Sequence, residues 1–257
     1  MKRVWSSALS AYRRYRAATG ARRGFRLLSY LSISPVVIYL LLLSFPQVLF
    51  AHETSYRNLT VYSREPLDPS IYPVLDKVQS RLATSEINDQ SVRPKIFLTN
   101  SFGFYAWLSL RIGGNSFGKG FAALPNSNVF INKSDTATDL VFRNAPDNNQ
   151  RSLSGVIAHE TTHLLVRRKF GYWRNLTMPA WKKEGYAEYV GGGSTLPYDT
   201  GVRMWKQNPR DGTGYQYFKY YMLVKYLLEH EKLSVEDLFN RDFDMKGLEE
   251  KVLNSLI

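Results

Sequence analysis

The chain has 257 residues, 44% of them hydrophobic, which is enough for one substantial folded domain and an appendage. It contains no cysteine, which excludes a thiol nucleophile, cysteine zinc ligands and a disulfide framework. The formal net charge is +12, but eight Lys or Arg and no acid lie in residues 1–26. No aromatic and basic motif of a nucleic-acid-binding module occurs elsewhere, so we expect no nucleic-acid partner.

An uncharged stretch of 25 residues, 27–51, follows this basic tail. At about 1.5 Å per residue it is long enough to cross a hydrocarbon core of about 30 Å. Because the basic residues flank it on one side only, it predicts a single-pass membrane anchor with the N-terminus in the cytoplasm, and the segment and the basic tail would contact membrane lipid. A cleaved signal peptide, a buried core helix and an organellar presequence are the alternatives. Leu49 stands where a cleavage site needs a small residue, which favours the anchor.

Residues 52–68 are polar and irregular in pattern, which predicts a stalk leading to a domain over 69–257. An apolar stripe at helical spacing predicts a core-packing helix over 71–82.

Strand-forming residues then predict a strand over 95–99, and an aromatic-rich run predicts a short helix or covering loop over 102–110. Two further strand-like runs, 120–124 and 128–132, are joined by the turn-forming residues 125–127. These runs predict a hairpin.

The motif H-E-x-x-H occurs at His159, Glu160 and His163. Four residues apart on a helix, the two histidines share one face and can present two imidazole nitrogens to a single metal ion. Glu160 stands beside them, where it can deprotonate a water molecule on a catalytic zinc. The motif also arises by chance on amphipathic helices, but the positions around it are uncharged, as a helix buried under a metal site requires.

A third ligand is offered by Glu184, on a second predicted helix between Pro179 and the glycines 191–193. We expect Gly185, which lacks a side chain, to let this helix approach the first closely. Glu188 lies one turn further on and can accept the ring N–H of a ligating histidine, a contact that fixes the tautomer of such a ligand.

These two motifs together resemble the gluzincin branch of zinc metallopeptidases, over roughly residues 95–240. The resemblance implies that His159, His163 and Glu184 bind Zn²⁺, that Glu160 is the general base, and that Glu188 supports the ligands. The glycine and histidine of the metzincin pattern are replaced by other residues, and the aminopeptidase signature G-x-M-E-N is absent. The subfamily, and the choice between endopeptidase and exopeptidase, stay open.

The resemblance further implies that extended substrate adds to a sheet edge beside the metal helix, at Gly120, Phe121, Ala122 and Ala123. An ordinary exposed edge is the alternative.

Enzymes of this kind also use a tyrosine or histidine after the glutamate helix to stabilise the oxyanion. Several tyrosines crowd the start of the helix predicted over 215–231, and Tyr217 shares the stripe that faces the protein. A core tyrosine without a catalytic role, or a role for Tyr215 or Tyr220, is the alternative. His52 and His230 have no partner at ligand spacing and are expected to face solvent.

Two smaller helices, over 234–239 and 248–256, are predicted to close the chain. The sequence therefore predicts an α+β domain, with a small mixed sheet followed by a helical lobe as in zincins, behind one transmembrane helix. The predicted function is zinc-dependent hydrolysis of peptide bonds in peptides or proteins outside the cytoplasm. The alternative is a membrane-tethered binding or assembly factor that keeps the fold without turnover, against which the intact Glu160 argues.

Overall fold

The computed structural model divides the chain into two compact units, Met1–Val48 and Leu49–Ile257. The residues that it describes are 34–110, 115–120, 126–207 and 213–256. In the first unit residues 34–44 are helical. Within the described residues, no helix is both long enough and apolar enough to span a membrane. The predicted anchor over 27–51 lies partly outside those residues, and it stays a prediction.

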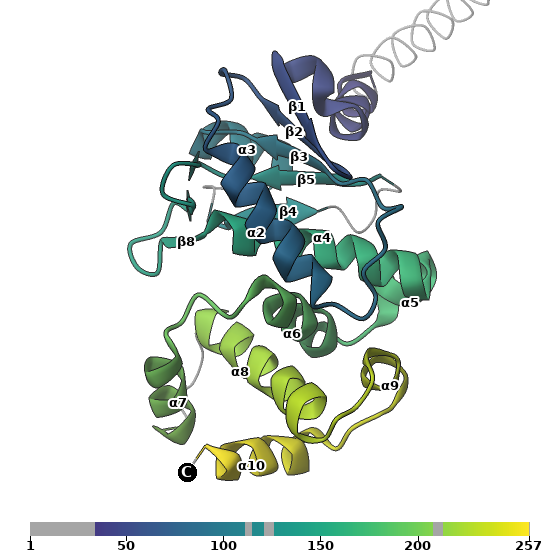
Figure 1. Ribbon diagram of the computed structural model, residues 1–257, viewed down its shortest axis with the longest axis vertical. Coiled ribbons are helices and arrows are strands. Elements are labelled where there is room, and N and C mark those ends of the chain that lie inside the picture. The colour runs from purple at the N-terminus through teal and green to yellow at the C-terminus, as the bar shows by residue number, and fades with distance from the viewer. Residues whose placement is uncertain (1–33, 111–114, 121–125, 208–212, 257) are drawn as a thin grey trace, which may run out of the picture. The chain divides into compact units, whose positions relative to one another are not determined.

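The second unit begins with a mixed five-stranded sheet (Figure 1). Its strands, in chain order, are β1 His52–Tyr56, β2 Leu59–Ser63, β3 Lys95–Leu98, β4 Gly118–Gly120 and β5 Asn128–Ile131. The spatial order is β1-β2-β3-β5-β4, with the three central strands parallel and the two outer pairs antiparallel. Val61, Ile96 and Val129 stand side by side across the central strands and are fully buried, so this row anchors the core. Strand β4 forms one edge of the sheet.

A second, antiparallel sheet has three short strands, β6 Ser134–Asp135, β7 Leu140–Phe142 and β8 Gln150–Ser152. The sequence did not indicate it, because strands of two or three residues carry too little periodicity to detect.

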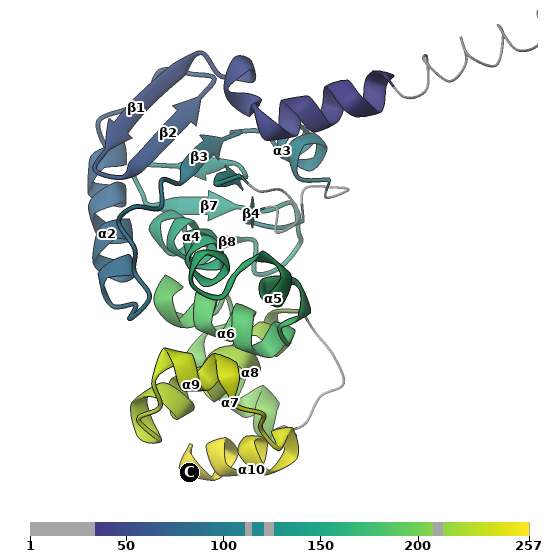
Figure 2. The same ribbon diagram turned by 90° about the vertical axis from the view of Figure 1, so that its right-hand side faces the viewer.

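Helices form the rest of the unit (Figure 2). They are α2 Ile71–Ala83, α3 Phe102–Ser109, α4 Leu153–Phe170, α5 Tyr172–Thr177, α6 Ala180–Gly191, α7 Tyr198–Gln207, α8 Thr213–Lys225, a π-helical turn Tyr226–His230, α9 Val235–Asn240 and α10 Met245–Ser255. Helix α4 packs against α2, β4 and β5 on one side and against α6 on the other, and α6 in turn packs against α8. The molecule is thus an α+β unit in which a mixed sheet is followed by a helical region.

The predicted stalk over 52–68 is wrong for residues 52–63, which form β1 and β2 of the main sheet. Strand β1 is an outer strand in which half-buried and exposed positions alternate, and its sequence HETSY is polar on both faces. A polar edge strand lacks the apolar alternation by which strands are recognised in a sequence, and for this reason the pattern predicts a stalk here.

The predicted hairpin is confirmed in part. Strand β4 pairs with β5 antiparallel, with Lys119 opposite Phe130, but it begins two residues before the predicted strand. Three predicted substrate-binding residues, Phe121, Ala122 and Ala123, lie outside the described residues.

Candidate metal centre

Helix α4 carries the H-E-x-x-H motif through the middle of the fold. It begins where the Ser152 hydroxyl accepts a hydrogen bond from the Gly155 N–H at 3.1 Å, and it ends at Gly171, whose φ of 86° only glycine adopts easily. Nearly every residue from Leu153 to Val166 is buried. A helix with buried residues on all sides is held by its neighbours in one position, which fixes the side chains that it presents.

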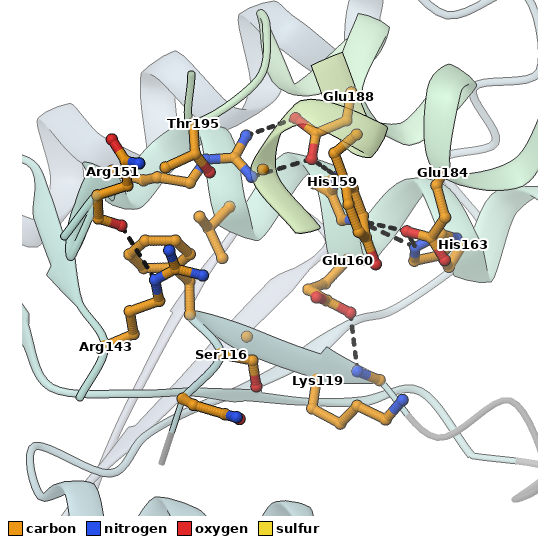
Figure 3. A pocket seen from close by; sticks show the side chains of 18 of the residues that line it. Ser116, Lys119, Arg143, Arg151, His159, Glu160, His163, Glu184, Glu188 and Thr195 are labelled. Atoms are coloured by element: carbon orange, nitrogen blue, oxygen red, sulfur yellow. Dashed lines mark hydrogen bonds and ion pairs between the residues drawn. The ribbon is translucent and has the colours of Figure 1, made fainter. Parts of the chain in front are cut away.

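His159, His163 and Glu184 bring three ligand atoms together (Figure 3). The two histidine Nε2 atoms lie 3.2 Å apart, and each lies 3.4 Å from Glu184 Oε2. Three ligands at about 2.05 Å from one tetrahedral ion would be separated by about 3.3 Å. Adjacent ligands of an octahedral ion at the same bond length would lie about 2.9 Å apart. The observed spacing is therefore compatible with one metal ion held by all three residues.

The charges around the triad favour a bound cation. Burial alone would raise the pKa of Glu184, but His163 and His159 outweigh it and hold that pKa well below its usual range. Burial alone would lower the pKa of His159, but the neighbouring carboxylates, Glu188 first among them, raise it. Several carboxylates thus converge on this point, and a divalent ion would balance their charge.

Glu188 lies beside His159, and it is almost fully buried. Its Oε1 atom is 3.5 Å from His159 Nδ1, longer than an ordinary hydrogen bond. Glu188 also accepts two hydrogen bonds from Arg151, from Nη1 at 3.0 Å and from Nη2 at 2.7 Å. Arg151 donates a further one to the Gly193 carbonyl at 2.7 Å. This bidentate pair fixes the orientation of Glu188 beside the histidine.

Sequence reasoning missed Arg151, which lies on β8. No local signal marks it, because its partner is 37 residues away and an arginine before a helix N-cap is unremarkable in a sequence.

A glycine contact brings α4 and α6 together, but the predicted glycine does not make it. A side chain on Gly185 would place its Cβ 2.4 Å from the Tyr220 carbonyl oxygen, so Gly185 serves the packing of α6 against α8. The α4–α6 contact is made by Gly155 and Gly191, where a Cβ on Gly155 would lie 2.8 Å from the Gly191 carbonyl oxygen. The expectation for Gly185 was wrong because each helix of this lobe packs on two sides, and the sequence does not say which neighbour a glycine faces.

Glu160 points toward the edge strand β4. Its Oε2 atom accepts a hydrogen bond from the Gly120 N–H at 2.8 Å. A Cβ on Gly118 would lie 3.0 Å from Glu160 Cγ and 2.9 Å from a Val156 methyl group, so the helix can approach the strand this closely only because residue 118 is glycine. The sequence G-K-G at residues 118–120 is the signal that could have indicated this contact.

The triad, Glu160 and Glu188 line one cleft of about 690 Å³. Gly120 and Tyr217, two further predicted site residues, line it too. Tyr215 is instead buried in the core, with its ring near Lys219, and the Tyr220 hydroxyl accepts a hydrogen bond from Gln216. Of the three candidate tyrosines, Tyr217 is thus the one in the cleft wall.

The remaining histidines take no part in this site. His52 lies at the start of β1 and is half-buried, whereas His230 is exposed and stacks on Tyr226 at 4.6 Å between ring centroids.

A comparison with models of known protein families finds no match, and a search of curated proteins finds no similar sequence.

Proposed function

We propose that this chain is a membrane-anchored zinc peptidase that hydrolyses peptide bonds outside the cytoplasm. The observation that carries the proposal is the triad of His159, His163 and Glu184, with ligand atoms 3.2–3.4 Å apart, in the same cleft as Glu160. Two imidazoles and one carboxylate leave a fourth coordination position for water, which is the pattern of hydrolytic rather than structural zinc sites. The resemblance to gluzincins, based on residues 154–190, supports the same reaction.

Zinc in this triad would polarise a substrate carbonyl and lower the pKa of a water molecule. Glu160 is the residue that would accept a proton from that water on a carboxylate oxygen and return it to the nitrogen of the leaving amine. The Gly120 N–H donates its hydrogen bond to Oε2 of Glu160. The other carboxylate oxygen, Oε1, does not accept that bond and can take the proton. Tyr217 would donate its hydroxyl proton in a hydrogen bond to the oxyanion.

The edge strand offers a place for the substrate backbone. The Asn132 N–H donates to the Phe117 carbonyl at 2.9 Å, and Lys119 pairs with Phe130, so alternate residues of this strand turn their backbone groups toward β5. Gly118 and Gly120 lie between them and turn theirs away from β5, where Glu160 already accepts the hydrogen bond of the Gly120 N–H. An extended peptide could therefore add to β4 next to Glu160.

A turnover assay on the full chain tests the function. The chain and its Glu160→Gln variant would be incubated with a complex peptide mixture, and the products read by mass spectrometry. We expect cleavage by the native chain and a loss of about 10²- to 10⁴-fold in Glu160→Gln, with zinc content unchanged in that variant. Zinc binding without any cleavage by the native chain would overturn the peptidase and favour the silent binding factor.

The location rests on the uncharged segment 27–51 and its one-sided basic flank. In intact cells, external protease should digest a C-terminal tag while sparing the N-terminal tail. A tag protected until the membrane is opened would contradict this orientation, and a mature N-terminus near His52 would contradict the anchor.

A further inference from the structure

One of several cationic side chains in the cleft wall, Arg143, is held by uncharged groups of its own loop. Arg143 begins the loop 143–149 between β7 and β8 and lines the same cleft as the triad. Its Nε donates to the Asn148 carbonyl at 3.0 Å, and its Nη2 makes a longer contact with the Asp147 carbonyl at 3.4 Å. The backbone of its own loop therefore holds the guanidinium in place. These bonds involve uncharged acceptors and leave its charge uncompensated.

A second guanidinium lies nearby. Arg143 and Arg151 both stand over the ring of Phe117, with Cζ atoms 5.0 Å and 5.9 Å from its centroid. Arg151 is neutralised by Glu188 at 2.7 Å. For Arg143, no ion pair with a carboxylate is found within the part of the chain that the structure describes. Burial and the charge of Arg151 both lower the pKa of Arg143, so an anion at this point would relieve an unfavourable arrangement.

The geometry of Arg143 suits a carboxylate. A guanidinium has five N–H donors in a planar fork, and the loop engages only Nε and Nη2. In Figure 3, Arg143 and the Glu184–His163 pair lie on opposite sides of Glu160. A peptide that extends along the cleft past Glu160 would thus bring one of its residues to Arg143.

We propose that Arg143 binds a carboxylate of the substrate and makes acidic peptides the preferred substrates of this cleft. The inference rests on the proposed peptidase function and names its substrate class. The carboxylate can belong to an Asp or Glu side chain or to the C-terminus of the peptide. Arg143 is then a specificity-determining residue, whereas a purely structural role in the loop 143–149 would change the turnover of all peptides equally.

The test measures kcat/KM of the full chain on peptide pairs. Within each pair, one peptide has Glu and the other has Gln at the same position. Successive pairs move that position one residue at a time along both sides of the cleaved bond. Every peptide is made with a free and with an amidated C-terminus, which distinguishes the two sources of the carboxylate. The variants are Arg143→Gln and, as the matched control, Arg203→Gln, which removes the same charge from an exposed position on α7.

We expect the native chain to favour one class of carboxylate by about 10-fold or more, as for a charge-assisted hydrogen bond in a partly exposed site. Arg143→Gln should remove that preference and leave kcat/KM on the neutral peptides within a few-fold. Arg203→Gln should keep it. Cleavage with no preference, or a preference that survives in Arg143→Gln or is equally lost in Arg203→Gln, would overturn the inference and leave the peptidase standing.

A binding measurement keeps the inference testable if no peptide is cleaved. In the Glu160→Gln background, fluorescence anisotropy of labelled Glu and Gln peptides would report affinity without turnover. The Glu peptide should bind about 10-fold more tightly, and adding Arg143→Gln should abolish the difference. Equal affinities in the Glu160→Gln protein would overturn the inference. Absence of cleavage together with a retained affinity difference would overturn the peptidase alone.

Discussion

The two walls of the cleft are built in contrasting ways. The helical wall, from α4 and α6, holds the ligand triad, and its inner carboxylate Glu188 is buried and bound by Arg151. The opposite wall, from β4 and the loop 143–149, is only partly buried and carries a half-buried sheet edge and a cation, Arg143, for which the described residues supply no ion pair. The first wall contains a buried carboxylate with its ion-pair partner, whereas the second has no such ion pair among the described residues. We infer that the helical wall fixes the metal donors and that the opposite wall is left for substrate.

The largest effect is expected at Tyr217, which lines the cleft together with the triad and Glu160. If its hydroxyl stabilises the oxyanion, Tyr217→Phe should lower kcat by about 10²- to 10³-fold while zinc content and fold persist. Steady-state kinetics with elemental analysis measures both. Tyr220→Phe is the matched control, since its hydroxyl is bonded to Gln216. Full activity in Tyr217→Phe would remove this tyrosine from the mechanism.

Substitutions of the two arginines over Phe117, Arg151 and Arg143, test whether the two walls have separate roles. Arg151→Gln would leave Glu188 as a buried carboxylate without its partner, which should lower the free energy of unfolding by about 3–5 kcal/mol. It should also weaken zinc binding by about 10- to 100-fold, because Glu188 would no longer be held beside His159. Urea unfolding and competition with a chelator measure the two quantities.

Arg143→Gln is the counterpart on the open wall. The substitution should leave the affinity for zinc unchanged. Native Arg143 donates its hydrogen bonds to the carbonyl groups of Asn148 and Asp147, and neither group contacts the triad. Equal effects of the two substitutions on zinc affinity would show that the walls are not functionally separate.

A smaller effect should follow from adding one methyl group to each wall. In Gly155→Ala the new Cβ would lie 2.8 Å from the Gly191 carbonyl oxygen, so α4 and α6 must separate. Overpacking of this kind typically costs about 1–3 kcal/mol, of which the better helix propensity of alanine returns up to about 1 kcal/mol. Thermal unfolding should therefore occur at a lower temperature.

The matching change on the open wall is Gly118→Ala, where the new Cβ would press on Glu160 and Val156. Displacing Glu160 should lower kcat by about 10- to 100-fold with zinc retained. A variant that lost zinc instead would contradict the separation of roles.

Much of the helical wall could be predicted from the sequence, and little of the open wall. The spacing of His159, Glu160 and His163, and the framing of Glu184 between Pro179 and the later glycines, are local patterns that indicate helices and ligands. The structure brings those ligands together as expected. Glu188 lies close to His159, but the hydrogen bond that was predicted from the ring N–H to its carboxylate is replaced by a longer contact of 3.5 Å.

The missed features depend on contacts between distant parts of the chain. Arg151 is recognised only by its distance from Glu188, and Gly155 only by its contact with Gly191. The polar sequence of β1 predicts a stalk, because the strand forms only by pairing with β2, which no local pattern shows. Arg143 could not be distinguished in the sequence from any other loop arginine, since its significance lies in its place in the cleft wall and in its lack of an ion pair within the described residues.

The zinc content of the purified full chain tests the central claim most directly. After exposure to zinc and removal of the excess, elemental analysis should find about one zinc per native chain and per Glu160→Gln chain. His163→Ala should hold almost none, because two remaining ligands make an incomplete site. A His163→Ala chain that keeps as much zinc as the native chain, or a native chain that holds none, would contradict the account.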